Sequence, residues 1–153
     1  MRLLERAEPA HRGLERRSPQ ADTPLCPWML AWLGLPVLGI ANGVVRDVTY
    51  GQVASELAAH QLSTAILLLL LAAYLWALMR RWPIPTSRRA YTIGGIWAAL
   101  TILFELGFGH YLTGDSWATL LHAYNVADGR VWAAVPLWTL VGPEIIRRVR
   151  ARR

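Results

Sequence analysis

Apolar residues gather in four long runs along this chain, and polar stretches separate the runs from one another. The runs cover residues 25–45, 57–79, 91–111 and 131–146. A helix needs roughly 20 apolar residues to cross the ~30 Å hydrocarbon layer of a membrane, and the first three runs have that length. The fourth is shorter and lies at the low end of the range. The pattern predicts an all-α protein that forms a four-helix transmembrane bundle.

Prolines and polar turns set the limits of these runs. Pro27 suits the first turn of a helix, where its missing N–H costs nothing. Pro36 lies in the middle of the first run and predicts a kink there. The polar turn from Arg80 to Pro85 ends the second run. Residues 1–24 are rich in charge and proline, which predicts a flexible tail.

The placement of arginine predicts an orientation. All sixteen basic residues are arginines, a bias typical of GC-rich bacterial genomes. Fourteen of them fall in three segments that four spans would bring to one side: the N-terminal tail, the turn at 80–89 and the C-terminal tail. The positive-inside rule makes that side cytoplasmic. We therefore expect a multi-pass protein of the bacterial inner membrane with both termini inside, divided into a flexible cytoplasmic tail (1–24), a transmembrane domain (25–147) and a basic cytoplasmic tail (148–153).

Composition narrows the possible partners and chemistry. The formal net charge of +6 could indicate nucleic-acid binding, but the arginines lie at the ends of apolar runs rather than on a basic domain. We expect them to contact membrane lipids, with no nucleic acid as partner. The single cysteine, Cys26, excludes an internal disulfide and dithiol exchange chemistry.

The segment between the third and fourth runs, TGDSWATLLHAYNVADGR, contains a short helical pattern. Asp115 or Ser116 can cap its start. The apolar residues that follow recur at spacings of three and four and form one stripe: Trp117, Leu120, Leu121 and Tyr124. Such a stripe, rimmed by Trp and Tyr, predicts a short helix lying in the outer membrane interface. A simple connector is the alternative.

Unusual polar residues occur at comparable depths in the first three runs. Antiparallel spans bring the end of the first, the start of the second and the end of the third to the same side of the bundle. The candidate ligand-binding residues are therefore expected to converge in its outer part: Asn42, Arg46, His60, Gln61, Thr64 and Glu105.

A carboxylate as deep in a span as Glu105 is costly unless it faces inward and has a partner. Arg46 is the partner we predict. The polar residues around the pair either hold three helices in register or form a binding site, and the sequence leaves both alternatives open.

Two classes of function remain. The first is a binding or accessory module whose outward-facing polar pocket holds a lipid headgroup, a small ligand or a partner's helix. The second is an intramembrane enzyme acting on a lipid-linked or quinone-like substrate, with His60 and Glu105 as acid and base. No spacing motif supports a metal or haem site of His60 and His110, so no metal site is predicted. The cofactor is left unknown, and partners other than lipids are a membrane protein or a second copy of the chain.

Five motifs occur in a fixed order along the chain: NGVVRD, AHQLST, LFELGFGH, SWATLLHAYN and GRVW. Over about Gly39 to Leu140 the chain resembles a group of small four-span bacterial membrane proteins to which no activity is attached. The resemblance carries over no mechanism and implies only that these motifs occur together.

Overall fold

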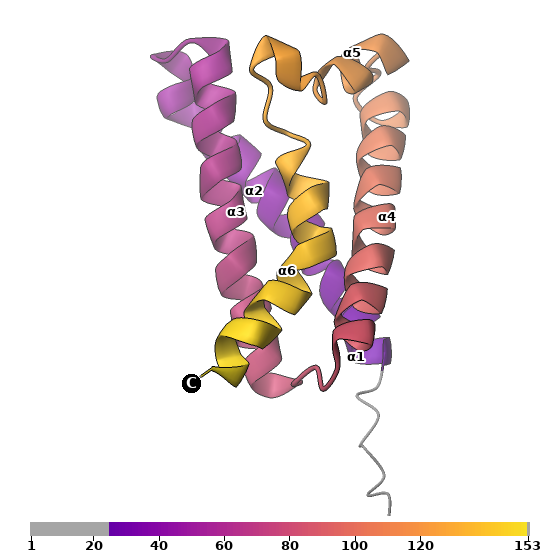
Figure 1. Ribbon diagram of the computed structural model, residues 1–153. Coiled ribbons are helices and arrows are strands. Elements are labelled where there is room, and N and C mark those ends of the chain that lie inside the picture. Colours follow the sequence, from indigo (N-terminus) through magenta and orange to yellow (C-terminus); the bar gives the residue numbers. More distant parts are fainter. Residues whose placement is uncertain (1–24, 153) are drawn as a thin grey trace, which may run out of the picture.

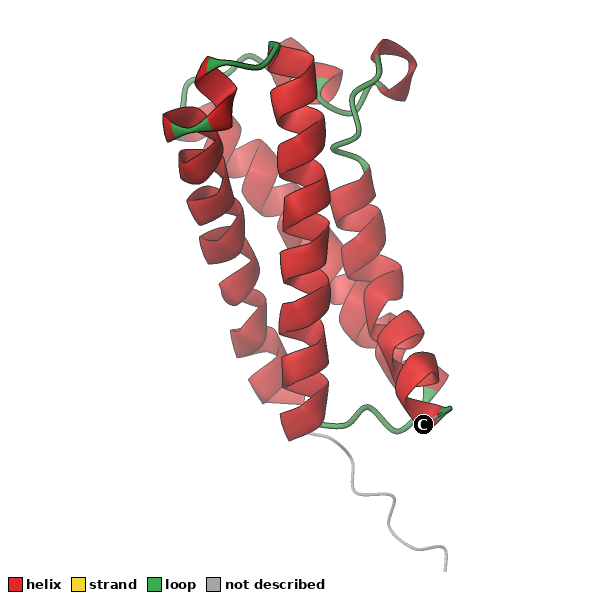
Figure 2. Ribbon diagram, turned by 90° about the vertical axis from the view of Figure 1, so that its left-hand side faces the viewer, coloured by secondary structure: helices red, strands yellow, loops and turns green. Residues whose placement is uncertain are grey.

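The computed structural model describes residues 25–152, and this part of the chain is helical and contains no strand (Figures 1 and 2). The predicted flexible tail, residues 1–24, lies outside the described residues, as does Arg153. The elements in chain order are α1 (Leu25–Trp32), α2 (Gly34–Val48), the 3-10 turn η1 (Tyr50–Gln52), α3 (Glu56–Arg81), α4 (Ser87–Tyr111), α5 (Trp117–His122), the 3-10 turn η2 (Val126–Asp128) and α6 (Ala134–Ala151).

Three helical stretches in the described residues are long and apolar enough to cross a membrane: Leu25–Val48, Glu56–Arg81 and Ser87–Tyr111. The predicted all-α membrane-type architecture is confirmed at this level. α6 lies in the bundle between α3 and α4 (Figure 1). It is not among the three stretches, and it carries Glu144 and the arginines of its last turns.

The first stretch is interrupted at Leu33, which separates α1 from α2. The cause is Pro36, which has no N–H to offer the carbonyl of Trp32 four residues earlier. Instead, the N–H of Leu33 donates to the carbonyl of Leu30 at 3.1 Å. The interruption lets α1 pack against α4 while α2 leans away toward α3 (Figure 1). The predicted kink is present, and it separates α2 from α4 at the far end of the bundle.

α3 supports this interruption from the side. The hydroxyl of Tyr74 donates to the carbonyl of Ala31 at 2.7 Å. Gly34 makes room for that phenol, since a methyl group at Gly34 would lie 2.5 Å from the Tyr74 oxygen. Tyr74 thereby bonds the helix break to α3 through the carbonyl of Ala31.

The tightest packing lies at the end of the bundle that holds the turn between α3 and α4. Trp28, Met79, Ile93 and Trp97 are all at most 2% exposed. The indole of Trp97 donates to the carbonyl of Trp28 at 2.9 Å, and the two ring centroids are 5.7 Å apart. Close van der Waals packing and an interhelical hydrogen bond of this kind hold helices together in a membrane, where the lipid tails are themselves apolar.

α4 and α6 approach so closely that backbone touches backbone. At Gly94, an added methyl group would lie 2.1 Å from the carbonyl oxygen of Leu140 on α6. Nearer the chain end, the buried carboxylate of Glu144 accepts from Arg147 at 2.7 and 2.9 Å, from Arg148 at 2.5 Å and from Ser87 of α4 at 3.0 Å. Glu144 therefore pairs with two arginines of its own helix, and Ser87 extends these pairs into a link between α4 and α6.

The segment after α4 crosses the opposite end of the bundle (Figure 1). Ser116 caps α5 by accepting from the N–H of Thr119 at 3.1 Å. Three residues of the predicted stripe reach α4: Leu120 lies against Gly109, the hydroxyl of Tyr124 binds Glu105, and the Trp117 ring stacks on His110. Trp117 is still 48% exposed, and Leu121 is 61% exposed.

Candidate functional site

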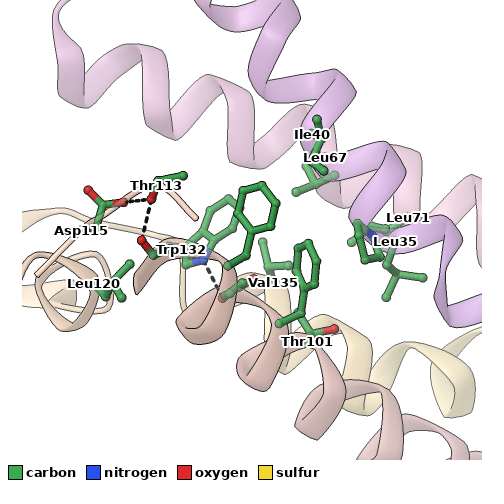
Figure 3. Close-up of a pocket in the computed structure, with 16 residues that line it drawn as sticks. Leu35, Ile40, Leu67, Leu71, Thr101, Thr113, Asp115, Leu120, Trp132 and Val135 are labelled. Carbon is green, nitrogen blue, oxygen red and sulfur yellow. Dashed lines mark hydrogen bonds between the residues drawn. The ribbon is translucent and has the colours of Figure 1, made fainter. Parts of the chain in front are cut away.

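A cavity of about 320 Å³ lies where α2 and α4 diverge. We call it the Glu105 cavity. In Figure 3, Ile40 and Leu67 lie on one side of it, Trp132 and Val135 on the other, and Thr113, Asp115 and Leu120 at one end. Its walls are mostly apolar and come from α2 to α4, the α5 segment and the start of α6: Leu35, Pro36, Gly39, Ile40, Leu67, Leu71, Thr101, Phe104, Glu105, Phe108, Gly109, Thr113, Asp115, Leu120, Trp132 and Val135.

Glu105 is held from the α5 side of the bundle. The hydroxyl of Tyr124 and the indole N–H of Trp132, the latter at 2.9 Å, both donate to its Oε2. Burial raises the pKa of Tyr124 above its usual range, and the hydrogen bond to Glu105 and that carboxylate's charge raise it further. The phenol therefore stays a donor throughout the physiological pH range.

The second carboxylate oxygen of Glu105 is different. Within residues 25–152, no side chain or backbone group donates a hydrogen bond to Oε1. Glu105 itself lines the Glu105 cavity, whose walls are mainly apolar. The site therefore offers an acceptor to a ligand that brings its own N–H or O–H group.

The predicted Arg46–Glu105 ion pair is wrong. Arg46 donates through Nε to the adjacent Asp47 at 2.8 Å, and no ion pair joins it to Glu105 in the described part of the chain. The depth of a residue along its helix indicates its height in the bundle, but it does not indicate the sideways distance between two helices. Arg46 lies on the last turn of α2, which packs on α3 and leans away from α4.

Arg46 lies instead in a second cavity, of about 210 Å³, together with three other predicted site residues. His60, Gln61 and Thr64 of α3 line it, and so does Arg130, which was not among the predicted site residues. We call it the Arg46–Arg130 cavity. Gln61 binds the loop that carries Arg130 to α3, because its amide nitrogen donates to the carbonyl of Gly129 at 2.9 Å.

Asn42 lines neither cavity. It is 6% exposed and donates to Ser63 of α3, at 2.7 Å to the hydroxyl and 3.0 Å to the carbonyl. It therefore links α2 to α3. Hydrogen bonds of this kind hold neighbouring helices together in membrane proteins.

The predicted acid–base couple of His60 and Glu105 is not brought together. His60 lines the Arg46–Arg130 cavity, Glu105 lines the other one, and Trp132 lies in the walls of both. His110 is stacked on Trp117 with ring centroids 4.2 Å apart, and it is not among the residues that line the cavity of His60. In the described residues, no group of three or more His, Cys, Asp or Glu side chains could hold a metal ion.

Comparisons with known proteins add nothing to this geometry: no family model, no curated protein and no solved structure matches the chain. A functional conclusion therefore rests on the two cavities and on the side chains that line them.

Proposed function

We propose that this chain is a four-span protein of the bacterial inner membrane whose function is binding. Its ligand is a small apolar molecule with a hydroxyl or amine head, and the binding site is the Glu105 cavity. The observation that carries the proposal is the open Oε1 of Glu105 in a cavity that is otherwise mostly apolar. A carboxylate oxygen that faces a mostly apolar cavity is costly without a hydrogen-bond donor, and a ligand that supplies one gains specificity from it.

The polarity of the cavity defines the class of ligand further. Glu105 and Asp115 are its charged lining residues, and both are acidic. They disfavour a ligand with an anionic head and favour one that donates a hydrogen bond. A volume of about 320 Å³ suits a small molecule or one end of a lipid chain.

Binding is favoured over catalysis because of how the polar groups are distributed. An enzyme would need its acid and base within hydrogen-bond reach of one substrate. His60 and Glu105 line different cavities, so neither cavity contains both members of the proposed couple.

The membrane topology rests on α6 and on charge. α6 lies along α4, and its buried Glu144 is neutralised by Arg147 and Arg148. If α6 crosses as the fourth span, the arginine-rich turn and the C-terminal tail lie on one side, as the positive-inside rule requires. α5 would then lie in the outer interface, with Trp117 and Leu121 toward the lipid.

Cysteine labelling is expected to show this topology. In a Cys26→Ser background, Val53→Cys and Val126→Cys lie in exposed turns and should react with a membrane-impermeant maleimide in intact spheroplasts. Ser18→Cys and Arg152→Cys should react only after lysis. Reaction of Arg152→Cys in intact cells would show that α6 does not cross the membrane.

Filling the Glu105 cavity is expected to prevent ligand binding. Gly39 lines the cavity, and a Cβ added there meets nothing within 4 Å, so Gly39→Leu should fit and occupy the ligand's space. The measurement is photolabelling in nanodiscs with a diazirine derivative of dodecanol, read by peptide mass spectrometry. Labelling of α2 and α4 should be competed by dodecanol in the wild type and lost in Gly39→Leu.

Gly43→Leu is the matched control. Gly43 lies one turn further along α2, its Cβ position is also open, and it does not line the cavity. Both variants gain helix propensity, by about 1 kcal/mol. Gly43→Leu should therefore keep the competed labelling. Equal, uncompeted labelling of both variants would mean that the probe only samples the lipid-facing surface, and the proposal would fail.

A further inference from the structure

The Arg46–Arg130 cavity is assembled from three parts of the chain and is positively charged. Arg46 comes from the end of α2, His60 from the start of α3 and Arg130 from the loop after η2. The two arginine side chains are largely covered, at 22% and 28% exposure. None of the described residues that line this cavity is acidic.

Both arginines have acidic neighbours, but these neighbours leave most of the guanidinium donors unused. Asp47 takes the Nε of Arg46, and Glu56 lies 3.5 Å from one terminal nitrogen of Arg130. Both acids are exposed to solvent, at 64% and 75%, so they lie at the rim. In the described part of the chain no acceptor takes a hydrogen bond from the terminal nitrogens of Arg46.

Two hydrogen bonds hold parts of this cavity in place. The bond from Gln61 to the carbonyl of Gly129 holds the residue next to Arg130 against α3. The Nδ1–H of His60 is engaged by the carbonyl of Glu56 at 3.0 Å, which fixes the ring and leaves Nε2 for another partner. A site with its charged groups held in place loses less entropy when it binds.

We propose that the Arg46–Arg130 cavity binds a phosphate group. Guanidinium groups suit phosphate because they are always charged and present several N–H donors in one plane. The volume of about 210 Å³ fits a single phosphate with its immediate substituents better than a large ligand. Inorganic phosphate and the head group of an anionic phospholipid both supply this chemistry.

This site goes beyond the binding function proposed for the Glu105 cavity. The two cavities share Trp132 as a wall, but their charges are opposite, so they select different groups. An apolar alcohol should enter the first and a phosphate the second. Either site can therefore exist if the other does not.

The test is calorimetric titration of inorganic phosphate into the full chain in an uncharged detergent at low salt. Arg46→Gln and Arg130→Gln should each weaken binding by about 10- to 100-fold, since each removes a charged hydrogen-bond donor. Arg46→Lys should fall between Arg46→Gln and wild type, because lysine keeps the charge but not the planar pair of donors. Arg88→Gln, which removes an exposed arginine from the start of α4, should bind as wild type does.

A parallel arm identifies the source of the phosphate. Native mass spectrometry counts the phosphatidylglycerol molecules that the protein retains after purification from nanodiscs. Titratable inorganic phosphate points to a free ligand, whereas retained lipid that Arg46→Gln and Arg130→Gln lose points to a head group; either result supports the site. The proposal is overturned if neither probe binds, or if Arg88→Gln weakens binding as much as the other two glutamine variants. Competed dodecanol labelling in the same variants checks that they are folded and reports separately on the Glu105 cavity.

Discussion

Gly94→Ala is expected to lower the free energy of unfolding by about 3 kcal/mol, at the upper end of the range for overpacked sites. The added methyl group would lie 2.1 Å from the carbonyl oxygen of Leu140 and 3.1 Å from that of Thr139. Both obstacles are backbone atoms of α6, so no side-chain rotation can relieve the clash. The two helices would have to separate, and the core at this end of the bundle would loosen with them. Steric trapping in bicelles measures the change.

Gly95→Ala is the control for this prediction. Gly95 is the next residue of α4, and a Cβ there meets nothing within 4 Å. The substitution should be neutral or stabilise the protein by up to about 1 kcal/mol through helix propensity. Equal stability of the two variants would contradict the close approach of α4 and α6.

Tyr124→Phe is expected to cost about 2 kcal/mol, because it removes one of the two donors to the carboxylate of Glu105. The same change should loosen the α5 segment, since the Tyr124 hydroxyl binds it to α4. Faster hydrogen exchange of residues 116–129 is therefore expected along with the loss of stability. Tyr111→Phe, at a ring that is 78% exposed, should change neither measurement.

Two double-mutant cycles test which residue is the partner of Glu105: Tyr124, as in the structure, or Arg46, as predicted from the sequence. Tyr124→Phe and Glu105→Gln should show a coupling energy of about 1–2 kcal/mol, as residues in contact do. Arg46→Gln and Glu105→Gln should be additive within about 0.5 kcal/mol, because the two residues share no partner. Strong coupling in the second cycle would restore the Arg46–Glu105 pair.

Features that depend on the residues of a single helix could be predicted from the sequence. Long apolar runs predicted the helices, Pro36 predicted the interruption near Leu33, and Ser116 was among the predicted caps of α5. Four of the six candidate site residues line one cavity, because helical spacing and antiparallel order do bring them to the same level.

Contacts that depend on the sideways distance between helices could not be predicted from the sequence. The distance from Arg46 to Glu105 is set by the direction in which α2 leans after the break, and no residue near either side chain encodes it. Tyr124 was assigned to an apolar stripe, although its hydroxyl is the group that matters to Glu105. Trp132 was counted only as part of a short apolar run, and nothing in its neighbours signals that its indole N–H binds a carboxylate 27 positions earlier.

The interruption at Leu33 also gives the two halves of the bundle different surfaces toward lipid, one closed and one open. Before it, Trp28 of α1 is fully buried against Trp97 of α4, and the wall is closed. After it, α2 lies on α3, and the wall beside α4 opens into the Glu105 cavity. In the proposed orientation the closed half faces the cytoplasmic leaflet and the open half faces the outer leaflet. One proline would thereby restrict the protein to sampling molecules from a single leaflet of the membrane.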